Sequence, residues 1–149
     1  MTIYYPYVFS EWTVEYKPFM RKPRTAKRFI MTNLVKGETH FVDYRLPMKE
    51  IEHFPSMGML PQKWSIDDAA EASYEFLRRY YIHNIRSWKV PVIESVYSQL
   101  LYLPYDIFCK EQKGKKQLFL YEYMSESSDV VEKYEEIQTY ITLRGGVCS

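Results

Sequence analysis

The pattern of apolar and polar positions predicts one long amphipathic helix near the middle of the chain. Between Ser65 and Ile85, apolar or small side chains recur every three or four residues, and charged side chains occupy the opposite side. This spacing puts the apolar side chains on one face of an α-helix. Ser65, with Asp68 three residues later, fits a capping box at the helix start. We therefore expect a helix from about Ser65 to Ile85 that lies with one face on an apolar layer.

A second helix is predicted within residues 127–146, near the end of the chain. Its apolar side chains follow helical spacing at Val130, Val131, Tyr134, Ile137 and Ile141. The glycines at 145 and 146 supply a stop signal, and Asp129 with Glu132 is a candidate cap.

The segments outside these two helices follow strand patterns. Residues 27–46 have β-rich flanks around Lys36-Gly37, which predicts a hairpin, and residues 117–124 alternate between two faces. Residues 91–103 carry mixed signals, because Pro91 suits a helix start while β-branched side chains and tyrosine suit a strand. We favour the strand. Residues 47–64 contain three prolines and a glycine and are typical of an irregular connection.

Two parts of the chain resemble each other. The stretch "YYPYVFSEW" at residues 4–12 is followed by a basic segment and the apolar stretch "FIMTNL", and "YLPYDIF" at residues 102–108 is followed by a basic segment and "LFLYEY". Each set predicts a hairpin with a basic turn. The resemblance indicates a duplicated hairpin unit, or coincidence in a chain with fifteen tyrosines.

Length and composition favour a single folded domain covering residues 1–149, because 46% hydrophobic and 26% charged residues are typical of a globular protein. The aromatic content of 17% suits half-buried sheet faces and interfaces. We expect an α+β fold: an antiparallel sheet of four to six strands, the long amphipathic helix packed on one face, and the C-terminal helix.

The chain carries no pattern typical of export or membrane insertion. Its start has no basic segment followed by an apolar run, and no eighteen uncharged apolar residues follow one another. Cys109 and Cys148 form no CxxC motif and suggest neither a zinc site nor a redox pair. These features favour a reducing compartment, and we expect a cytoplasmic protein.

Motifs that carry catalysis are missing from the sequence. The glycine-rich loops of nucleotide sites, HExxH and GxSxG do not occur. Cys109 beside Lys110 is a candidate nucleophile, but no histidine is near it in sequence, so we expect it to be packed or idle. We expect no catalytic residues, no cofactor and no metal, while an enzyme of unrecognised type remains open.

Charge is distributed unevenly along a chain whose formal net charge is only +1. Residues 17–28 contain six basic and no acidic side chains, whereas residues 122–136 have a local charge of −5. If the two basic turns meet at one end of the sheet, they form an anion site, with Phe19 available to stack on a base. The alternative is that basic turns only keep hairpin ends solvated. The candidate anion-binding residues are Lys17, Arg21, Lys22, Arg24, Lys27, Arg28, Lys113, Lys115 and Lys116.

Three functions remain open. We favour a non-enzymatic accessory or adaptor domain that acts through protein contacts or self-association, with Met57, Met59 and Trp64 as candidate interface residues. The alternative is nucleic-acid or phosphate binding through the basic turns. The third is a pocket for a small hydrophobic ligand between sheet tyrosines and Phe76 or Tyr80.

Overall fold

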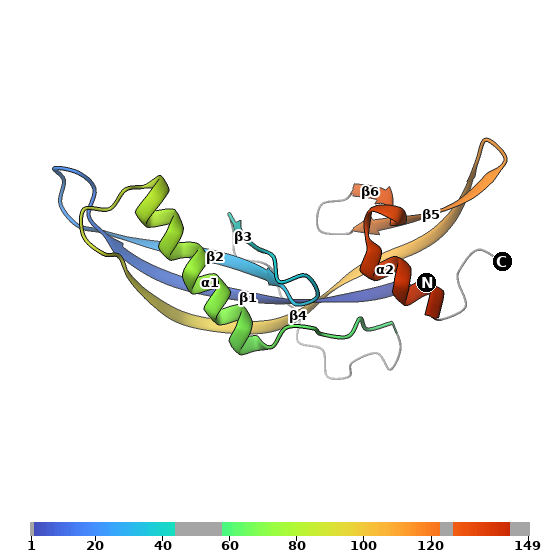
Figure 1. The fold of residues 1–149 in the computed structure, drawn as a ribbon, viewed down its shortest axis with the longest axis horizontal. Helices are drawn as coiled ribbons and strands as arrows, with labels where there is room; N and C mark the ends of the chain where they lie inside the picture. The colour runs from blue at the N-terminus through green and yellow to red at the C-terminus, as the bar shows by residue number, and fades with distance from the viewer. Residues whose placement is uncertain (1, 44–57, 123–126, 144–149) are drawn as a thin grey trace. The chain divides into compact units, whose positions relative to one another are not determined.

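A computed structural model describes residues 2–43, 58–122 and 127–143 of the chain (Figure 1). The described residues form a six-stranded sheet in the order β3-β2-β1-β4-β5-β6, with two α-helices. This confirms the predicted α+β fold. The elements are β1 (Thr2–Tyr16), β2 (Arg24–Asn33), β3 (Thr39–Val42), α1 (Ile66–Arg79), the π-helical turn η1 (Tyr80–Asn84), β4 (Val92–Gln112), β5 (Lys115–Glu122), β6 (Ser127–Val130), the 3₁₀ turn η2 (Val131–Lys133) and α2 (Glu135–Leu143).

The chain divides into two compact units. The terminal unit comprises Met1–Pro6, Ile51–Pro61 and Tyr102–Ser149, and the central unit comprises Tyr7–Glu50 and Gln62–Leu101. The strands β1 and β4 each supply residues to both units. We describe each unit by itself, and the single domain remains a prediction.

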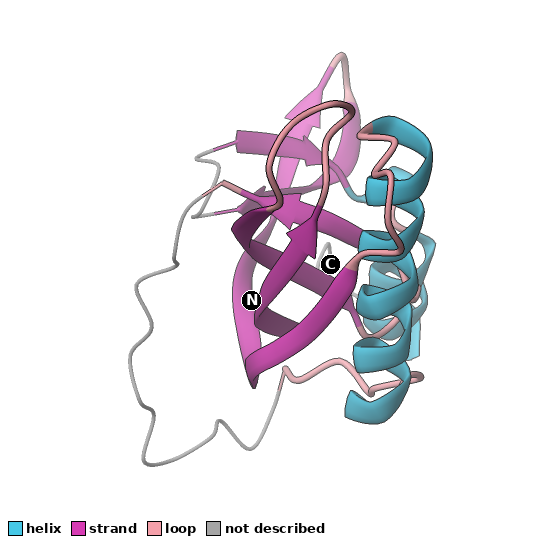
Figure 2. Cartoon of the chain, turned by 90° about the vertical axis from the view of Figure 1, so that its left-hand side faces the viewer, coloured by secondary structure: helices cyan, strands magenta, loops and turns pink. Residues whose placement is uncertain are grey.

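In the central unit α1 covers one face of the strands (Figure 2). Alternate residues of β1 and β2 point toward the helix, as the two-residue period of a strand requires. There they form a buried apolar cluster with the helix residues Leu77 and Tyr81; its strand members are Trp12, Val14 and Ile30. Two polar side chains join the same face, because the hydroxyls of Ser73 and Thr32 are hydrogen-bonded at 3.1 Å.

The start of α1 confirms the predicted capping box. The Asp68 backbone N–H donates to the Ser65 hydroxyl, and the Ser65 backbone N–H donates to the Asp68 carboxylate, both at 3.0 Å. The bond from the Ser65 backbone holds the pKa of Asp68 below its ordinary value. Together α1 and η1 cover residues 66–84, so the predicted helix is confirmed at both ends within one residue.

Both hairpins that were predicted to have a basic turn are present in the structure. β1 pairs antiparallel with β2, and β4 pairs antiparallel with β5 around Lys113 and Gly114, whose positive φ angles of 52° and 75° suit a two-residue turn. The hairpin predicted around Lys36-Gly37 is also confirmed, and so is the strand favoured for residues 91–103, which the structure includes in β4 from Val92 onward. Whether the two hairpins are duplicates remains a prediction.

The prediction of a helix through residues 127–146 is wrong in its first half. Residues 127–130 form β6, which pairs antiparallel with β5, and within the described residues 127–143 the α-helix covers only Glu135–Leu143. The spacing of the valines fits a helix, but tertiary contacts decide the conformation here. Pairing with β5 gives the backbone N–H and C=O groups of residues 127–130 their hydrogen bonds, so these residues do not need a helix to satisfy them. Ile137 and Ile141 are buried on α2, as the spacing predicted, and Tyr140, which was not in the predicted apolar set, is buried there too.

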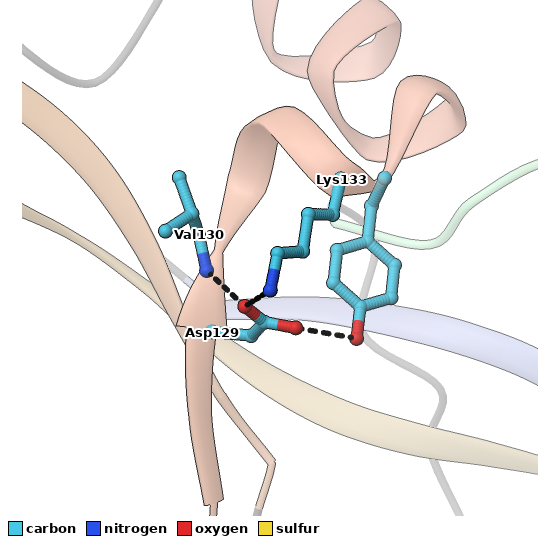
Figure 3. A network of polar contacts seen from close by, with 4 residues as sticks. Asp129, Val130 and Lys133 are labelled. Atoms are coloured by element: carbon cyan, nitrogen blue, oxygen red, sulfur yellow. Dashed lines mark hydrogen bonds and ion pairs between the residues drawn. The ribbon is translucent and has the colours of Figure 1, made fainter.

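The Asp129 carboxylate links β6 to the turn that follows it in the terminal unit (Figure 3). Its Oδ1 accepts a hydrogen bond from the Val130 backbone N–H at 2.8 Å and lies 2.9 Å from Lys133 Nζ. Its Oδ2 lies 3.5 Å from the Tyr134 hydroxyl, which donates to it. The Lys133 ammonium and the Val130 N–H hold the pKa of Asp129 below its ordinary value.

A lowered pKa makes the contribution of Asp129 depend on pH. Since the folded carboxyl ionises more readily than the unfolded one, its stabilisation is present above the unfolded pKa of about 4 and is lost as pH falls through the folded pKa. We expect Asp129→Asn to flatten the loss of stability between about pH 5 and pH 2. Thermal unfolding across that range checks this, with Glu132→Gln as a control that removes a carboxylate from the same stretch; equal slopes for wild type and Asp129→Asn would contradict it.

Candidate functional site

Two segments that are distant in sequence meet at one end of the central unit. They are the turn between β1 and β2 and the connection from η1 to β4, which lie together at the left of Figure 1. The Trp88 backbone N–H donates to the Lys17 carbonyl at 2.8 Å, and the Lys17 backbone N–H donates to the Ser87 hydroxyl at 3.0 Å. The Ser87 hydroxyl in turn donates to the Lys89 carbonyl at 2.7 Å. These bonds fix one segment to the other, and we name residues 17–24 and 85–90 the tip.

The tip exposes two aromatic rings that stack on each other. The ring centroids of Phe19 and Trp88 lie 5.0 Å apart, with 24° between the ring planes. Their exposed fractions are 61% and 62%. Stacking covers one face of each ring, so much of the remaining ring surface faces water. Large exposed apolar groups that are gathered in one place mark interaction sites in folded proteins.

The two segments that carry this ring pair are rich in basic residues. Residues 17–24 contribute Lys17, Arg21, Lys22 and Arg24, and residues 85–90 contribute Arg86 and Lys89. Neither segment contains an aspartate or a glutamate, so four charges plus two give the tip a formal charge of +6. Lys17 is half-buried and the other five side chains are exposed.

Two tip residues have a backbone conformation that normally favours glycine. Met20 and Arg86 have φ angles of 53° and 58°, in the left-handed region. Glycine adopts this conformation without the steric cost that a Cβ atom brings. The tip therefore carries a thioether and a guanidinium at positions where the backbone alone would favour a smaller residue.

Arg28 does not belong to the exposed charge of the tip. It lies on the face of β2 that meets α1, where its guanidinium carbon is 4.3 Å from the centroid of the Phe41 ring and 5.1 Å from that of Tyr80. Its Nε is buried and has no hydrogen-bond partner in the described part of the chain. The cation is held by aromatic faces. Burial raises the pKa of the adjacent Tyr81, whose ring lies 4.8 Å from that of Tyr16 at the base of the tip.

The remaining predicted basic residues fall in two places. Lys27 is exposed on β2 and pairs with Thr13 of β1. Lys113, Lys115 and Lys116 are exposed at the β4–β5 turn, which belongs to the terminal unit. The structure therefore describes the two basic turns in different units, and one anion site shared by both remains a prediction.

The structure describes two of the three predicted interface residues, one in each unit, and an interface formed by all three remains a prediction. Met57 lies outside the described residues, and Met59 forms a parallel bridge with Tyr4 in the terminal unit. Trp64 belongs to the central unit, where its ring lies against Gly37 and its backbone N–H donates to the Leu34 carbonyl at 2.9 Å. Its exposed fraction is 38%, so part of the ring is covered.

Few groups in the described ranges suit catalysis or metal binding. Cys109 is disulfide-bonded and so offers no thiolate as a nucleophile. Within residues 2–43, 58–122 and 127–143, no three His, Cys, Asp or Glu side chains gather as a metal site would require. Phe76 and Tyr80, the predicted pocket residues, pack their rings against Phe41 at 4.8 and 4.9 Å. No helix among these residues has the length and apolar character needed to cross a membrane.

No family model, no curated protein and no solved structure matches this chain. A candidate function therefore has to come from the chemistry of the described residues. Sequence reasoning found the basic half of the tip and Phe19, but it missed Arg86, Trp88 and Lys89. The signal that was available is the stretch "RSWK" between the helix and Pro91, where a tryptophan stands among polar residues.

Proposed function

We propose that the protein is a non-enzymatic binding module that contacts nucleic acid through its tip. The observation that carries this proposal is the convergence of two distant segments, fixed by hydrogen bonds, into a surface with six cations and no acid. Phosphate groups are recognised by such clusters of lysine and arginine. Since the formal net charge of the chain is only +1, the attraction is local to the tip.

The aromatic pair adds a contact that phosphate binding alone does not need. Phe19 and Trp88 stand among cations that the β1–β2 turn and the η1–β4 connection supply together. Nucleic-acid sites combine cationic groups for the backbone with rings on which bases stack. A turn whose lysines only kept a hairpin end solvated would not need exposed rings at its centre.

A second candidate is protein binding, the adaptor function that the composition favours. Met20 and Val90 are exposed by 85% and 80%, and neither side chain has a role in binding phosphate. Methionine, tryptophan, phenylalanine and arginine are enriched in protein interfaces. A partner that fits the tip would present acidic side chains around apolar ones, and a second copy of the chain is included in this class.

Fluorescence anisotropy with labelled 20-nucleotide strands and duplexes tests the first candidate. We expect Lys22→Glu with Arg24→Glu to weaken binding at least tenfold in about 50 mM salt, because two phosphate contacts become repulsive. The matched control, Lys63→Glu with Arg79→Glu, makes the same charge change on exposed residues of the same unit outside the tip. Wild-type protein that binds neither strands nor duplexes, or equal loss in both double variants, would contradict the proposal. Polyglutamate that binds as tightly as nucleic acid would favour an acidic protein partner instead.

A further inference from the structure

We infer that the nucleic acid bound by the tip is single-stranded, and that an unpaired base stacks on the Phe19–Trp88 pair. This inference rests on the proposed function and adds the strand form and the residues that select it. The pair is stacked at 5.0 Å between centroids, and both rings are about three-fifths exposed. A base offers a flat π surface of the kind that such rings bind.

The ring pair is held in place before any ligand arrives. Trp88 is bonded through its backbone to Lys17, and Lys17 is bonded in turn to the Ser87 hydroxyl. Arg21 N–H donates to the Pro18 carbonyl at 3.2 Å and closes the turn that carries Phe19. A surface that is already ordered loses less conformational freedom on binding than a flexible loop does.

Met20 and Arg86, which stand near the two rings in sequence, have a backbone conformation that is sterically unfavourable for any residue with a Cβ atom. Met20 follows Phe19 directly, Arg86 precedes Trp88 by two positions, and both have left-handed backbones. Strained positions of this kind cluster at sites that contact ligands. Arg86 adds a planar cation to the same short segment as Trp88, which suits a phosphate next to a stacked base.

The arrangement favours an unpaired strand over a duplex. In a duplex the flat faces of the bases are stacked on one another, so only their edges are accessible in the grooves. A two-stranded ribbon can enter the major groove, but here the end of the β1–β2 ribbon carries the segment 85–90 alongside it. Exposed rings contact bases that an unpaired strand leaves free.

The test compares a labelled oligothymidine strand with a duplex of the same length, using anisotropy at several salt concentrations. We expect the strand to bind at least tenfold more tightly and log affinity to fall with log salt at a slope of about −2 to −4, as three to six phosphate contacts predict. Trp88→Ala is expected to weaken strand binding at least fivefold and Trp88→Phe to retain it within about threefold, because a phenyl ring still stacks. If circular dichroism shows that Trp88→Ala disturbs the fold, Phe19→Ala replaces it, because Phe19 lies in an exposed turn. The loss of strand affinity in Phe19→Ala then measures the contribution of the ring pair.

Each outcome decides between specific alternatives. Equal affinity for strand and duplex, or unchanged strand binding by both alanine variants, overturns the single-strand inference and leaves the proposed function standing. If the wild-type protein binds neither the strand nor the duplex, the single-strand inference and the proposed function are both wrong. Binding to vesicles that contain phosphatidylserine, without binding to either nucleic acid, overturns both and assigns the tip to an anionic lipid surface.

Discussion

Replacing Leu77 with alanine is expected to lower the free energy of unfolding of the central unit by about 2–5 kcal/mol. Leu77 is fully buried, and it packs with Trp12, Val14 and Ile30 where α1 meets the strands. The smaller side chain loses apolar contact and leaves a cavity that the surrounding sheet fills only in part.

Urea unfolding followed by circular dichroism of the helix measures this loss. Tyr74→Ala is the matched control, because Tyr74 lies one turn away on the same helix and is 40% exposed. Its replacement should cost roughly 1 kcal/mol or less. Similar losses in both variants would show that the face of α1 that carries Leu77 does not form the core.

Replacing Gly58 with alanine is expected to destabilise the terminal unit by about 2–5 kcal/mol. Gly58 has a φ of +88°, and a Cβ atom there would lie 2.5 Å from the Thr2 carbonyl oxygen. The segment cannot simply move away, because the Gly58 carbonyl accepts a bond from the Tyr4 N–H at 2.7 Å and the Leu60 N–H donates to Tyr4 at 3.0 Å. The substitution therefore combines a strained backbone with a close contact to backbone atoms.

Gly114→Ala separates these two effects. Gly114 belongs to the same unit and has a φ of +75°, yet nothing lies within 4 Å of the position of its Cβ. It should cost only the left-handed conformation, about 1–2 kcal/mol. Equal losses of unfolding free energy in the two variants would mean that residues 58–60 do not pack beside β1.

Rules that act over a few residues predicted much of the fold. The Ser65 and Asp68 cap and the turn at Gly37 each follow from the side chains or backbone freedom of two or three neighbours. The end of the chain did not follow such rules. Val130 fits both a helix and a strand, and its partner Phe119 in β5 decides for the strand.

The candidate site could be predicted only in part, because some of its residues are brought together by contacts between segments that are distant in sequence. Lys22 and Arg24 stand in a basic run that is visible in any window, whereas Trp88 joins them only because Lys17 and Ser87 are hydrogen-bonded across the fold. Arg28 was placed in the anion set although strand alternation puts it on the same face as Ile30, the face that meets α1. That alternation was a usable signal.

The central claim, that the tip takes up an unpaired base, is tested most directly by photochemical crosslinking. A single strand that contains 5-bromouracil is irradiated with the full-length protein, and mass spectrometry of the digested complex identifies the linked residue. The account predicts adducts on Trp88 or Phe19, which disappear when excess unlabelled strand competes. Adducts confined to residues of the terminal unit, or adducts on Trp64 in place of Trp88, would contradict it.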